Sequence, residues 1–209
     1  MARLLSVNVG RPQPVGLRLG RTVQSAIAKA PVAGRVRVGG VNVEGDDQAD
    51  RRVHGGPDKA IYAYAGEDTA WWSAQLDREL GAGPFGENLT VEGVDVSGAV
   101  IGERWRLGTV ELEVCQPRFP CFKLGLRFGD PTTLRRFTQA ERPGAYLRIL
   151  REGEIGAGDA IEVDGRPDHG ITIALVARAV MIDDRLLVHA ASAPALPGDL
   201  ADWMRERAA

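Results

Sequence analysis

The sequence predicts a mainly β fold with inserted helices (α+β), in which a barrel or sandwich precedes a small helical segment. Short runs of alternating apolar and polar residues fill the first two thirds of the chain, with glycine, proline or aspartate between them. Closely spaced short strands of this kind are typical of a barrel or a sandwich. Beyond residue 166 the composition shifts toward alanine, and the apolar residues follow helical spacing.

A series of segments is expected to be strands, because each is a short alternating run bounded by turn residues. They are residues 2–9, 34–43, 59–64, 87–91, 101–107, 110–115, 145–150 and 160–163. A glycine-rich turn at residues 153–159 lies between the last two and would bring the final strand back to close the sheet.

Two helices are expected between the strands. The first begins at an acidic pair, ends at Gly81 and carries an apolar stripe of Trp72, Leu76 and Leu80. The second spans residues 131–140, with a proline in its first turn. We expect residues 1–166 to form the core domain. Residues 167–209 are expected to form three short helices, at 171–181, 184–190 and 199–207, which are too small to fold alone and pack on the barrel.

The composition excludes several functional classes. With 209 residues, 44% hydrophobic and 26% charged residues and a net charge of -2, the chain is typical of a soluble globular protein and not of a nucleic-acid-binding or disordered one. The N-terminus has no signal-peptide pattern, and the longest apolar stretch, residues 171–182, is too short to cross a bilayer. We therefore expect a cytoplasmic protein without a nucleic-acid or membrane partner.

Cys121 carries the strongest chemical signal. It lies in the run Gln-Pro-Arg-Phe-Pro-Cys-Phe-Lys at residues 116–123, beside two prolines and between the cations Arg118 and Lys123. A stiff backbone and nearby positive charge favour a thiolate, which binds metals or attacks electrophiles, so nucleophilic catalysis, redox sensing and metal binding all stay open. The second cysteine, Cys115, lies in an alternating strand and is expected to be a small buried side chain. Two cysteines do not indicate a disulfide framework.

Lysine is rare in this chain. It occurs only at Lys29, Lys59 and Lys123, against 23 arginines among the 26 basic residues. A compact ammonium differs from a planar guanidinium at a crowded phosphate or catalytic site, so each lysine is a candidate for function. A bias in nucleotide composition is the alternative explanation.

Two polar clusters suggest anion binding. Ser25 and Lys29 share a face if their segment is extended, so that hydroxyl and ammonium can meet one anion; an exposed edge strand is the alternative. His54 precedes Gly55 and Gly56 in a turn whose N–H groups suit a phosphate or another oxyanion, although ordinary loops contain such turns too. Among the histidines, His54 is the best candidate for a proton donor or ligand.

A third cluster, Glu87-Asn88, opens a strand. A carboxylate and an amide in succession can read the donor and acceptor edges of a heterocycle such as a pterin, or can simply close a turn. The sequence has no C-x-x-C pair, no H-E-x-x-H, no P-loop and no dinucleotide-binding fingerprint. A lone thiol with clustered anion-binding residues suits a phosphate-bearing cofactor whose metal takes one protein ligand.

Taken in order, these motifs resemble the MOSC domain, the family named for the C-terminal part of molybdenum cofactor sulfurases. The resemblance rests on Ser-x-Ile-x-Lys, Gly-Asp, His-Gly-Gly-x-Asp-Lys-Ala, Phe-Gly-Glu-Asn-Leu, Ile-Gly-Glu, Gln-Pro-Arg-x-Pro-Cys-x-Lys, Gly-x-Tyr-x-Arg-Ile-Leu and Gly-x-Gly-Asp. It runs from about residue 6 to residue 163 and is greatest for the bacterial YiiM group. Residues 171–207 are similar to an abbreviated form of that group's three-helix C-terminal domain.

The resemblance implies a MOSC-type β-barrel with a small C-terminal helical appendage, which binds the molybdenum cofactor through the cofactor's dithiolene and one protein cysteine. Cys121 would be that metal ligand and the catalytic centre, a role that suits a soft thiolate. The other residues implied in cofactor binding are Lys29, His54, Gly55, Gly56, Arg118 and Lys123 toward the phosphate and the charge of the cofactor, and Glu87 and Asn88 toward the pterin.

The resemblance also implies an activity. Relatives such as the mitochondrial amidoxime-reducing component reduce small N-hydroxylated compounds, removing oxygen from an N–OH group at molybdenum. His54 would be the catalytic proton donor, or would only shape its loop. The sequence carries no flavin, haem or iron–sulfur motif, so an external reductase with a flavin or iron–sulfur centre is expected to supply electrons. The oligomeric state stays open, with a homodimer as one option.

A carrier is the alternative function. In that reading Cys121 accepts a persulfide, or the domain stores the molybdenum cofactor and passes it on without turnover. The sulfurase relatives contain an N-terminal pyridoxal-phosphate desulfurase domain that these 209 residues lack. Pyridoxal phosphate binding is therefore a property of the family that we do not expect here. A loop-rich barrel without activity is a third reading.

Overall fold

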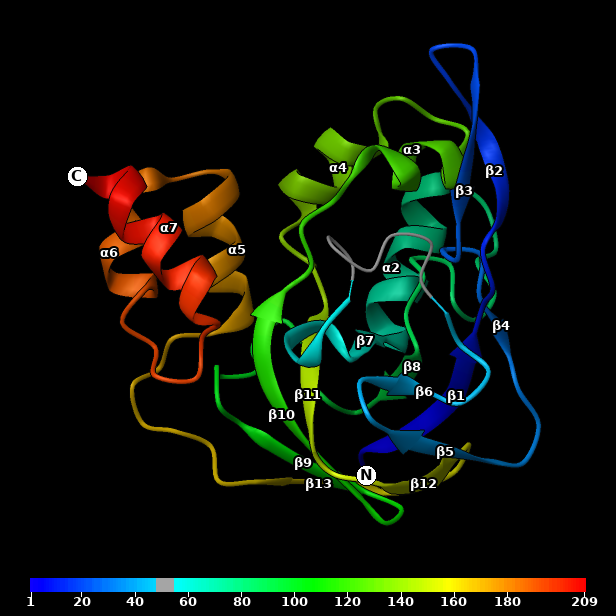
Figure 1. The fold of residues 1–209 in the computed structure, drawn as a ribbon, viewed down its shortest axis with the longest axis horizontal. Helices are drawn as coiled ribbons and strands as arrows, with labels where there is room; N and C mark the ends of the chain where they lie inside the picture. Colours follow the sequence, from blue (N-terminus) through cyan, green and yellow to red (C-terminus); the bar gives the residue numbers. More distant parts are fainter. Residues whose placement is uncertain (48–54) are drawn as a thin grey trace.

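An eight-stranded sheet forms the centre of the computed structural model, which describes residues 1–47 and 55–209 (Figure 1). The pair β7–β8 is parallel, and the other pairs of the sheet are antiparallel. In spatial order the strands are β13 (Ile161–Asp164), β9 (Arg104–Leu107), β10 (Val110–Pro117), β11 (Ala145–Arg151), β7 (Ile61–Ala65), β8 (Leu89–Glu92), β1 (Arg3–Val9) and β4 (Ala30–Pro31).

Backbone hydrogen bonds connect the two sides of this sheet. The Ile161 N–H donates to the Ala2 carbonyl at 3.0 Å, and the Gly158 N–H donates to the Leu4 carbonyl at 2.8 Å. An antiparallel bridge between Arg3 and Ala160 lies beside these hydrogen bonds. The segment that leads into β13 therefore lies along β1, as a barrel requires. The predicted mainly β fold with inserted helices is confirmed.

Two smaller sheets depart from the predicted strand pattern. The run 34–43 divides into two strands because the chain turns at Gly40, where φ is 61°. The expected turn at 153–159 contains a strand, and residues 13–25 form a hairpin that the sequence did not suggest. The strands are β12 (Gly153–Gly156), β5 (Arg35–Gly39) and β6 (Asn42–Val43) in one sheet, and β2 (Gln13–Arg18) and β3 (Arg21–Ser25) in the other.

Three α-helices lie between the strands in the part of the chain that the structure describes. The helix α2 (Gly66–Leu76) ends at Asp77, which takes φ 47°, so Leu80 lies beyond the helix that was expected to include it. The helix α4 (Thr133–Ala140) matches its prediction within two residues. The seven-residue helix α3 (Phe122–Phe128) was not predicted, because it is short and contains a glycine. In the described residues, every helix is too short or too polar to cross a bilayer.

The C-terminal segment consists of α5 (Ile173–Met181), a 3-10 turn η2 (Asp184–Leu186), α6 (Leu187–Ala190) and α7 (Gly198–Ala208). Figure 1 shows it beside β10, and α5 contacts that strand. Buried side chains of this segment, including Val176, Leu187 and Met204, belong to the same hydrophobic cluster as the barrel core. Residue 166 therefore separates a mainly β part of the chain from a helical part, but both parts contribute to one hydrophobic core.

A second, aromatic cluster lies under the helices. It consists of Tyr62, Tyr64, Trp72, Phe85, Leu124 and Phe137. The indole N–H of Trp72 donates to the Tyr64 hydroxyl at 2.9 Å, and that hydroxyl donates to the carbonyl of Arg142 at 3.0 Å. These bonds fix a layer of rings that β7 and β11 share with α2, α3 and α4.

Because barrel and C-terminal segment share one core, we expect the chain to unfold in a single transition. Met204→Ala should lower the free energy of unfolding by about 2–5 kcal/mol, since it removes a fully buried side chain. Thermal and urea unfolding followed by circular dichroism measure this effect. The exposed Val188→Ala is the control and should change stability by less than about 0.5 kcal/mol. Two separate transitions would contradict a shared core.

Candidate functional site

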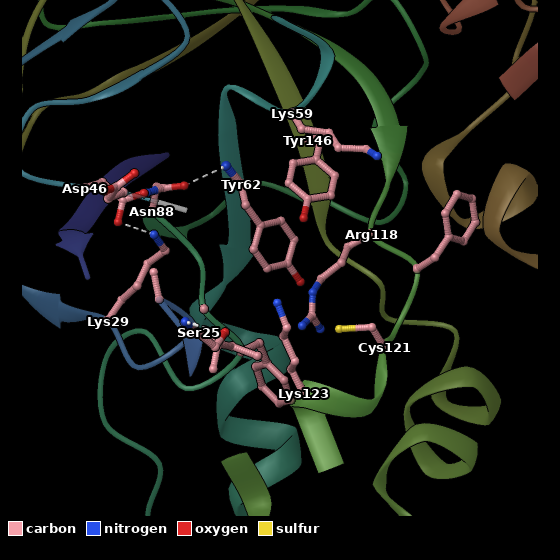
Figure 2. Close-up of a pocket in the computed structure, with 16 residues that line it drawn as sticks. Ser25, Lys29, Asp46, Lys59, Tyr62, Asn88, Arg118, Cys121, Lys123 and Tyr146 are labelled. Atoms are coloured by element: carbon pink, nitrogen blue, oxygen red, sulfur yellow. Dashed lines mark hydrogen bonds and ion pairs between the residues drawn. The ribbon is translucent and has the colours of Figure 1, made fainter. Parts of the chain in front are cut away.

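A pocket of about 670 Å³ opens where β3, β7 and β11 meet the junction of β10 and α3 (Figure 2). Loops from distant parts of the chain form its walls. Its described lining residues are Ser25, Ala26, Ile27, Lys29, Asp46, Asp47, Lys59, Tyr62, Phe85, Gly86, Asn88, Arg118, Phe119, Cys121, Lys123 and Tyr146.

All three lysines of the chain line this pocket. Together with Arg118 they bring four cations, against the carboxylates of Asp46 and Asp47 among the described lining residues. The pocket is thus positively charged in a chain of net charge -2. Lysine is rare in this chain, and all of its copies lie at one cavity. This placement favours a functional reason for the lysines over a bias in nucleotide composition. A positive, concave site is suited to an anionic ligand.

Cys121 stands at the rim where β10 gives way to α3. It is half-buried, its backbone is extended, and its carbonyl accepts the Leu124 N–H at 2.9 Å in the first turn of the helix. Leu124 is fully buried and anchors that turn. Figure 2 shows the sulfur of Cys121 directed toward the guanidinium of Arg118, with Lys123 nearby. The structure therefore brings the predicted thiol and both predicted cations into one place.

Cys115 is a different kind of thiol. It is fully buried in β10, and its Sγ donates to the carbonyls of Asp58 at 3.0 Å and Tyr146 at 3.3 Å. Burial raises its pKa to about 12, so this thiol stays protonated. The prediction of a small buried side chain is confirmed.

Arg118 is buried in the pocket wall, with 6% of its surface exposed. The centre of its guanidinium lies 5.5 Å from the ring centroid of Tyr62 and 5.4 Å from that of Phe137. Burial disfavours the charge, but Tyr62, Tyr146 and Cys121 outweigh it and raise the pKa of Arg118, so the group is a cation. Its Nη1 atom is buried and has no hydrogen-bond acceptor among residues 1–47 and 55–209. A buried donor without an acceptor costs about 1–3 kcal/mol, so this atom indicates a ligand that accepts its hydrogen.

The opposite wall is held by a polar network around Asp46. Lys29 forms an ion pair with Asp46, and both side chains are almost fully buried. The Asn88 amide donates to Asp46 at 2.9 Å and accepts the Tyr62 N–H at 3.1 Å. Burial lowers the pKa of Lys29 in spite of Asp46. Lys29 and Asn88 line the pocket as predicted, but their polar atoms also hold its framework.

Glu87 lies behind the pocket wall. Its fully buried carboxylate accepts the N–H groups of Gly83 and Phe85, each at 3.0 Å, and the hydroxyl of Thr90 at 3.3 Å. These bonds fix the loop that carries Phe85 and Gly86 into the pocket. Burial raises the pKa of Glu87 to about 7. The structure thus places this candidate toward its own loop, whereas we had expected it to face a pterin.

The predicted anion-binding turn is only partly described. His54 lies outside the described residues. Gly56 takes φ 96°, as a tight glycine turn requires, and leads into the 3-10 turn η1 (Pro57–Lys59), which places Lys59 in the pocket. In the described part of the pocket, the lining includes neither Gly55 nor Gly56.

The turn η1 is itself anchored to the sheet. The Asp58 carbonyl accepts the side-chain amide of Gln116 at 3.0 Å, and the Asp58 carboxylate forms an ion pair with Arg148. These contacts hold the backbone next to Lys59. The place at which the Lys59 side chain enters the pocket therefore depends on β10 and β11.

Two aromatic residues that line the pocket, Tyr62 and Tyr146, were not predicted as site residues. Tyr62 and Tyr146 are paired across β7 and β11, and their ring centroids lie 5.2 Å apart. They form the wall between the Lys29 side and the Cys121 side of the pocket (Figure 2). Each lies within three residues of a basic residue, Lys59 and Arg148 respectively, which was the available signal. Alternation alone did not show which face of each strand meets the cavity.

Comparison with known proteins agrees with this geometry. The MOSC domain family matches residues 50–162. The uncharacterized protein YflK of Bacillus subtilis is 38% identical over 175 residues, which are 84% of this chain and 79% of that protein. YiiM of Escherichia coli is 34% identical over 145 residues, 68% of this chain and 65% of that protein. A Gibberella moniliformis protein named reductase is 36% identical over 168 residues, 78% of this chain and 29% of that protein.

Solved structures show the same fold. The crystal structure of YiiM from Geobacillus stearothermophilus aligns with a TM-score of 0.81 and 30% identity, and the alignment covers 100% of both chains. The crystal structure of Escherichia coli YiiM aligns with a TM-score of 0.76 and 23% identity, over 100% of this chain and 92% of that one. The similarity to the Geobacillus protein therefore includes the C-terminal helices.

The buried carboxyl of Glu87 predicts a pH dependence of stability. Its folded pKa of about 7 exceeds the ordinary 4.5, so the folded state holds this proton more tightly than the unfolded state. Its contribution is complete below pH 4.5 and is lost as the pH rises toward 7, by up to about 3 kcal/mol at about 1.4 kcal/mol per pKa unit. Glu87→Gln should remove this slope from urea unfolding measured at pH 5 to 8. The exposed Glu162→Gln is the control. Equal slopes in wild type and Glu87→Gln would refute the assignment.

Proposed function

The chain belongs to the MOSC domain family, and we propose that it is a molybdenum-cofactor-dependent oxidoreductase that reduces N-hydroxylated compounds with electrons from a partner protein. One observation carries the proposal: the thiol of Cys121 shares a positively charged pocket with a buried guanidinium nitrogen of Arg118 that has no hydrogen-bond acceptor among the described residues. The relative named reductase favours redox chemistry over a purely structural role.

The residues of the pocket fit the molybdenum cofactor. Cys121 offers one soft sulfur ligand, and soft thiolates suit thiophilic transition metals. Three cations of the pocket would hold anionic groups of the cofactor: Arg118, Lys59 and Lys123. For Arg118 there is a specific reason, because its buried Nη1 has no hydrogen-bond acceptor among the described residues. When bound, the group supplies two-electron oxygen-atom transfer, which amino-acid side chains do not provide.

The side chains of the pocket prepare this chemistry. Arg118 and Lys123 place positive charge near Cys121, which favours its thiolate form. The rings of Tyr62, Phe85 and Tyr146 line the pocket and offer aromatic surface on which a planar heterocycle can stack. His54 belongs to the proposal as the donor of a proton to the substrate oxygen.

The balance of the reaction requires a second protein. Converting one N–OH to N–H consumes two electrons and two protons and releases one water. The sequence contains no flavin, haem or iron–sulfur motif to store those electrons. We therefore include in the proposal an external reductase with a flavin or iron–sulfur centre.

A chemically reduced dye replaces the reductase in the test that separates an enzyme from a carrier. If the protein is an enzyme, it should reduce benzamidoxime steadily with electrons from the dye. If it is a carrier, it should give no turnover.

Exchange of Cys121 tests the metal ligand. Protein from a host that makes the molybdenum cofactor should contain about one molybdenum per chain by elemental analysis, and Cys121→Ser should lose most of the metal and at least about 100-fold in dye-driven turnover. Cys115→Ala is the matched control and should keep both, because that thiol is fully buried and is not among the described lining residues of the pocket. Full molybdenum content in Cys121→Ser would exclude this residue as the ligand.

Exchange of Arg118 separates stability from cofactor binding. Arg118→Met should leave the free energy of unfolding of the cofactor-free protein unchanged or higher, because it replaces a buried charge with an apolar side chain of similar length. The same variant should retain less molybdenum and less pterin, measured by elemental analysis and by fluorescence of the oxidised pterin. Arg127→Met, an exposed change on α3, is the control. If Arg118→Met keeps the cofactor but destabilises the protein, Arg118 is a structural residue.

A further inference from the structure

The hairpin of β2 and β3 projects from the molecule beyond α3 (Figure 1). Its two strands are mostly exposed, and its tip carries Leu17 and Leu19, with 67% and 94% of their surfaces exposed. Two exposed leucines at the end of a protruding hairpin do not stabilise the isolated chain. They are available to a second molecule.

The turn at the tip violates a local preference. Leu19 and Gly20 form a two-residue loop between the paired residues Arg18 and Arg21, and both loop residues have positive φ, 50° and 74°. Such type I′ turns favour asparagine or aspartate followed by glycine. A leucine in the left-handed region costs about 1 kcal/mol, and here it gains no buried contact in return. Residues that break a local rule without a structural gain occur preferentially at functional sites.

The hairpin is also basic. Between residues 10 and 43 the sequence contains no aspartate or glutamate. Arg11, Arg18 and Arg21 are exposed, and none forms an ion pair with a residue that the structure describes. The adjoining helix α3 adds Lys123 and the exposed Arg127 and carries no acid. This face is thus positive although the net charge of the chain is -2.

The hairpin is connected to the pocket at two points. β3 ends at Ser25, a lining residue, about 13 Å from Arg21 at 3.3 Å per residue of strand. On β2, the guanidinium of Arg18 lies 3.9 Å from the ring centroid of Phe122, the residue after Cys121. The hairpin also fits closely against α3: a Cβ at Gly16 would lie 3.3 Å from the side chain of Leu126.

We propose that the tip of the β2–β3 hairpin, together with the exposed face of α3, is the docking surface for the electron donor, a protein with an acidic face around its flavin or iron–sulfur centre. This inference rests on the proposed function, which requires such a donor. Acidic residues of the donor pair with Arg21 near the tip and with Arg11, which precedes β2 at the base of the hairpin, and Leu17 and Leu19 fill an apolar depression of the donor. The contact brings the donor next to the pocket that consumes its electrons. An anionic membrane would also attract a basic hairpin, but it would not account for the position beside the pocket.

Charge reversal tests the docking surface. In Arg11→Glu/Arg21→Glu, which leaves the Arg18–Phe122 contact intact, kcat/KM for an acidic flavodoxin, kept reduced by its reductase, should fall at least about 10-fold. We expect kcat/KM of the wild type for flavodoxin to fall steeply as the salt concentration rises, and this dependence should disappear in the variant. The rate of turnover with reduced dye should be the same in both proteins. Arg151→Glu/Arg185→Glu, with the same change of charge elsewhere on the surface, is the matched control and should behave as wild type.

Leu19→Asn tests the apolar part of the surface. Asparagine tolerates the left-handed conformation, so the melting temperature should stay equal or rise. The KM for flavodoxin should nevertheless increase several-fold, and the dissociation constant of the cofactor-free protein for flavodoxin, measured by calorimetry, should increase in parallel. A turn without a docking role would give the same or higher stability but an unchanged KM and an unchanged dissociation constant for flavodoxin, and that result would contradict the proposal.

The outcomes separate this inference from the proposed function. If reduced dye gives no turnover in the wild type, the proposed function fails. If dye gives turnover but the double reversal leaves flavodoxin-driven and ferredoxin-driven rates unchanged, or if neither protein supports any rate, the docking surface is refuted. Arginine-dependent binding to vesicles of phosphatidylglycerol and phosphatidylcholine, together with unchanged donor kinetics, would assign the hairpin to a membrane and overturn the proposal.

Discussion

The guanidinium of Arg118 lies inside the protein, carries its charge there and has one nitrogen without an acceptor in the described structure. Desolvating a cation costs several kcal/mol, and stacking near Tyr62 and Phe137 offsets only part of that cost. The pocket around it is arranged accordingly. The rings of Tyr62 and Phe137 lie near the guanidinium, and Figure 2 shows the thiol of Cys121 directed toward it. Such a site offers a buried positive charge to an anionic ligand before that ligand binds.

The walls of the pocket divide into groups that are satisfied within the protein and groups that face the cavity. Asp46 is satisfied by Lys29, by Asn88 and by the Gly10 N–H at 2.7 Å. Glu87 is satisfied by its own loop. These buried carboxylates balance charge and fix backbone, which leaves the Cys121 side as the more positive half. The polarity of the cavity therefore runs from the Asp46 network toward Arg118, and an anionic ligand has one preferred orientation.

The sequence was sufficient for the fold class, because the pattern of short strands predicted the sheet. It also singled out Cys121, Arg118 and Lys123 by their residue types, and the structure places all three in the lining of one pocket. It failed where the decisive information is three-dimensional. Glu87 reads as a polar residue at a strand start, and only the fold shows its carboxylate turned toward Gly83 and Phe85. The β2–β3 hairpin was missed because its turn uses leucine at a position where asparagine is the usual signal.

The distribution of basic residues follows from the geometry of the pocket. Arginine replaces lysine almost everywhere in this chain, yet all three lysines are among the residues that line the cavity. An ammonium group is compact and strongly hydrated, so it can meet a multiply charged anion from several directions as the ligand enters. Arg118 is the exception within the described lining, and its surroundings explain why. The centre of its guanidinium lies 5.5 Å and 5.4 Å from the ring centroids of Tyr62 and Phe137, and a guanidinium keeps its charge when buried, whereas burial lowers the pKa of Lys29. The pocket thus combines one buried cation, Arg118, which sets the orientation of an anion beside Cys121, with the ammonium groups of Lys59 and Lys123, while the Lys29 ammonium pairs with Asp46.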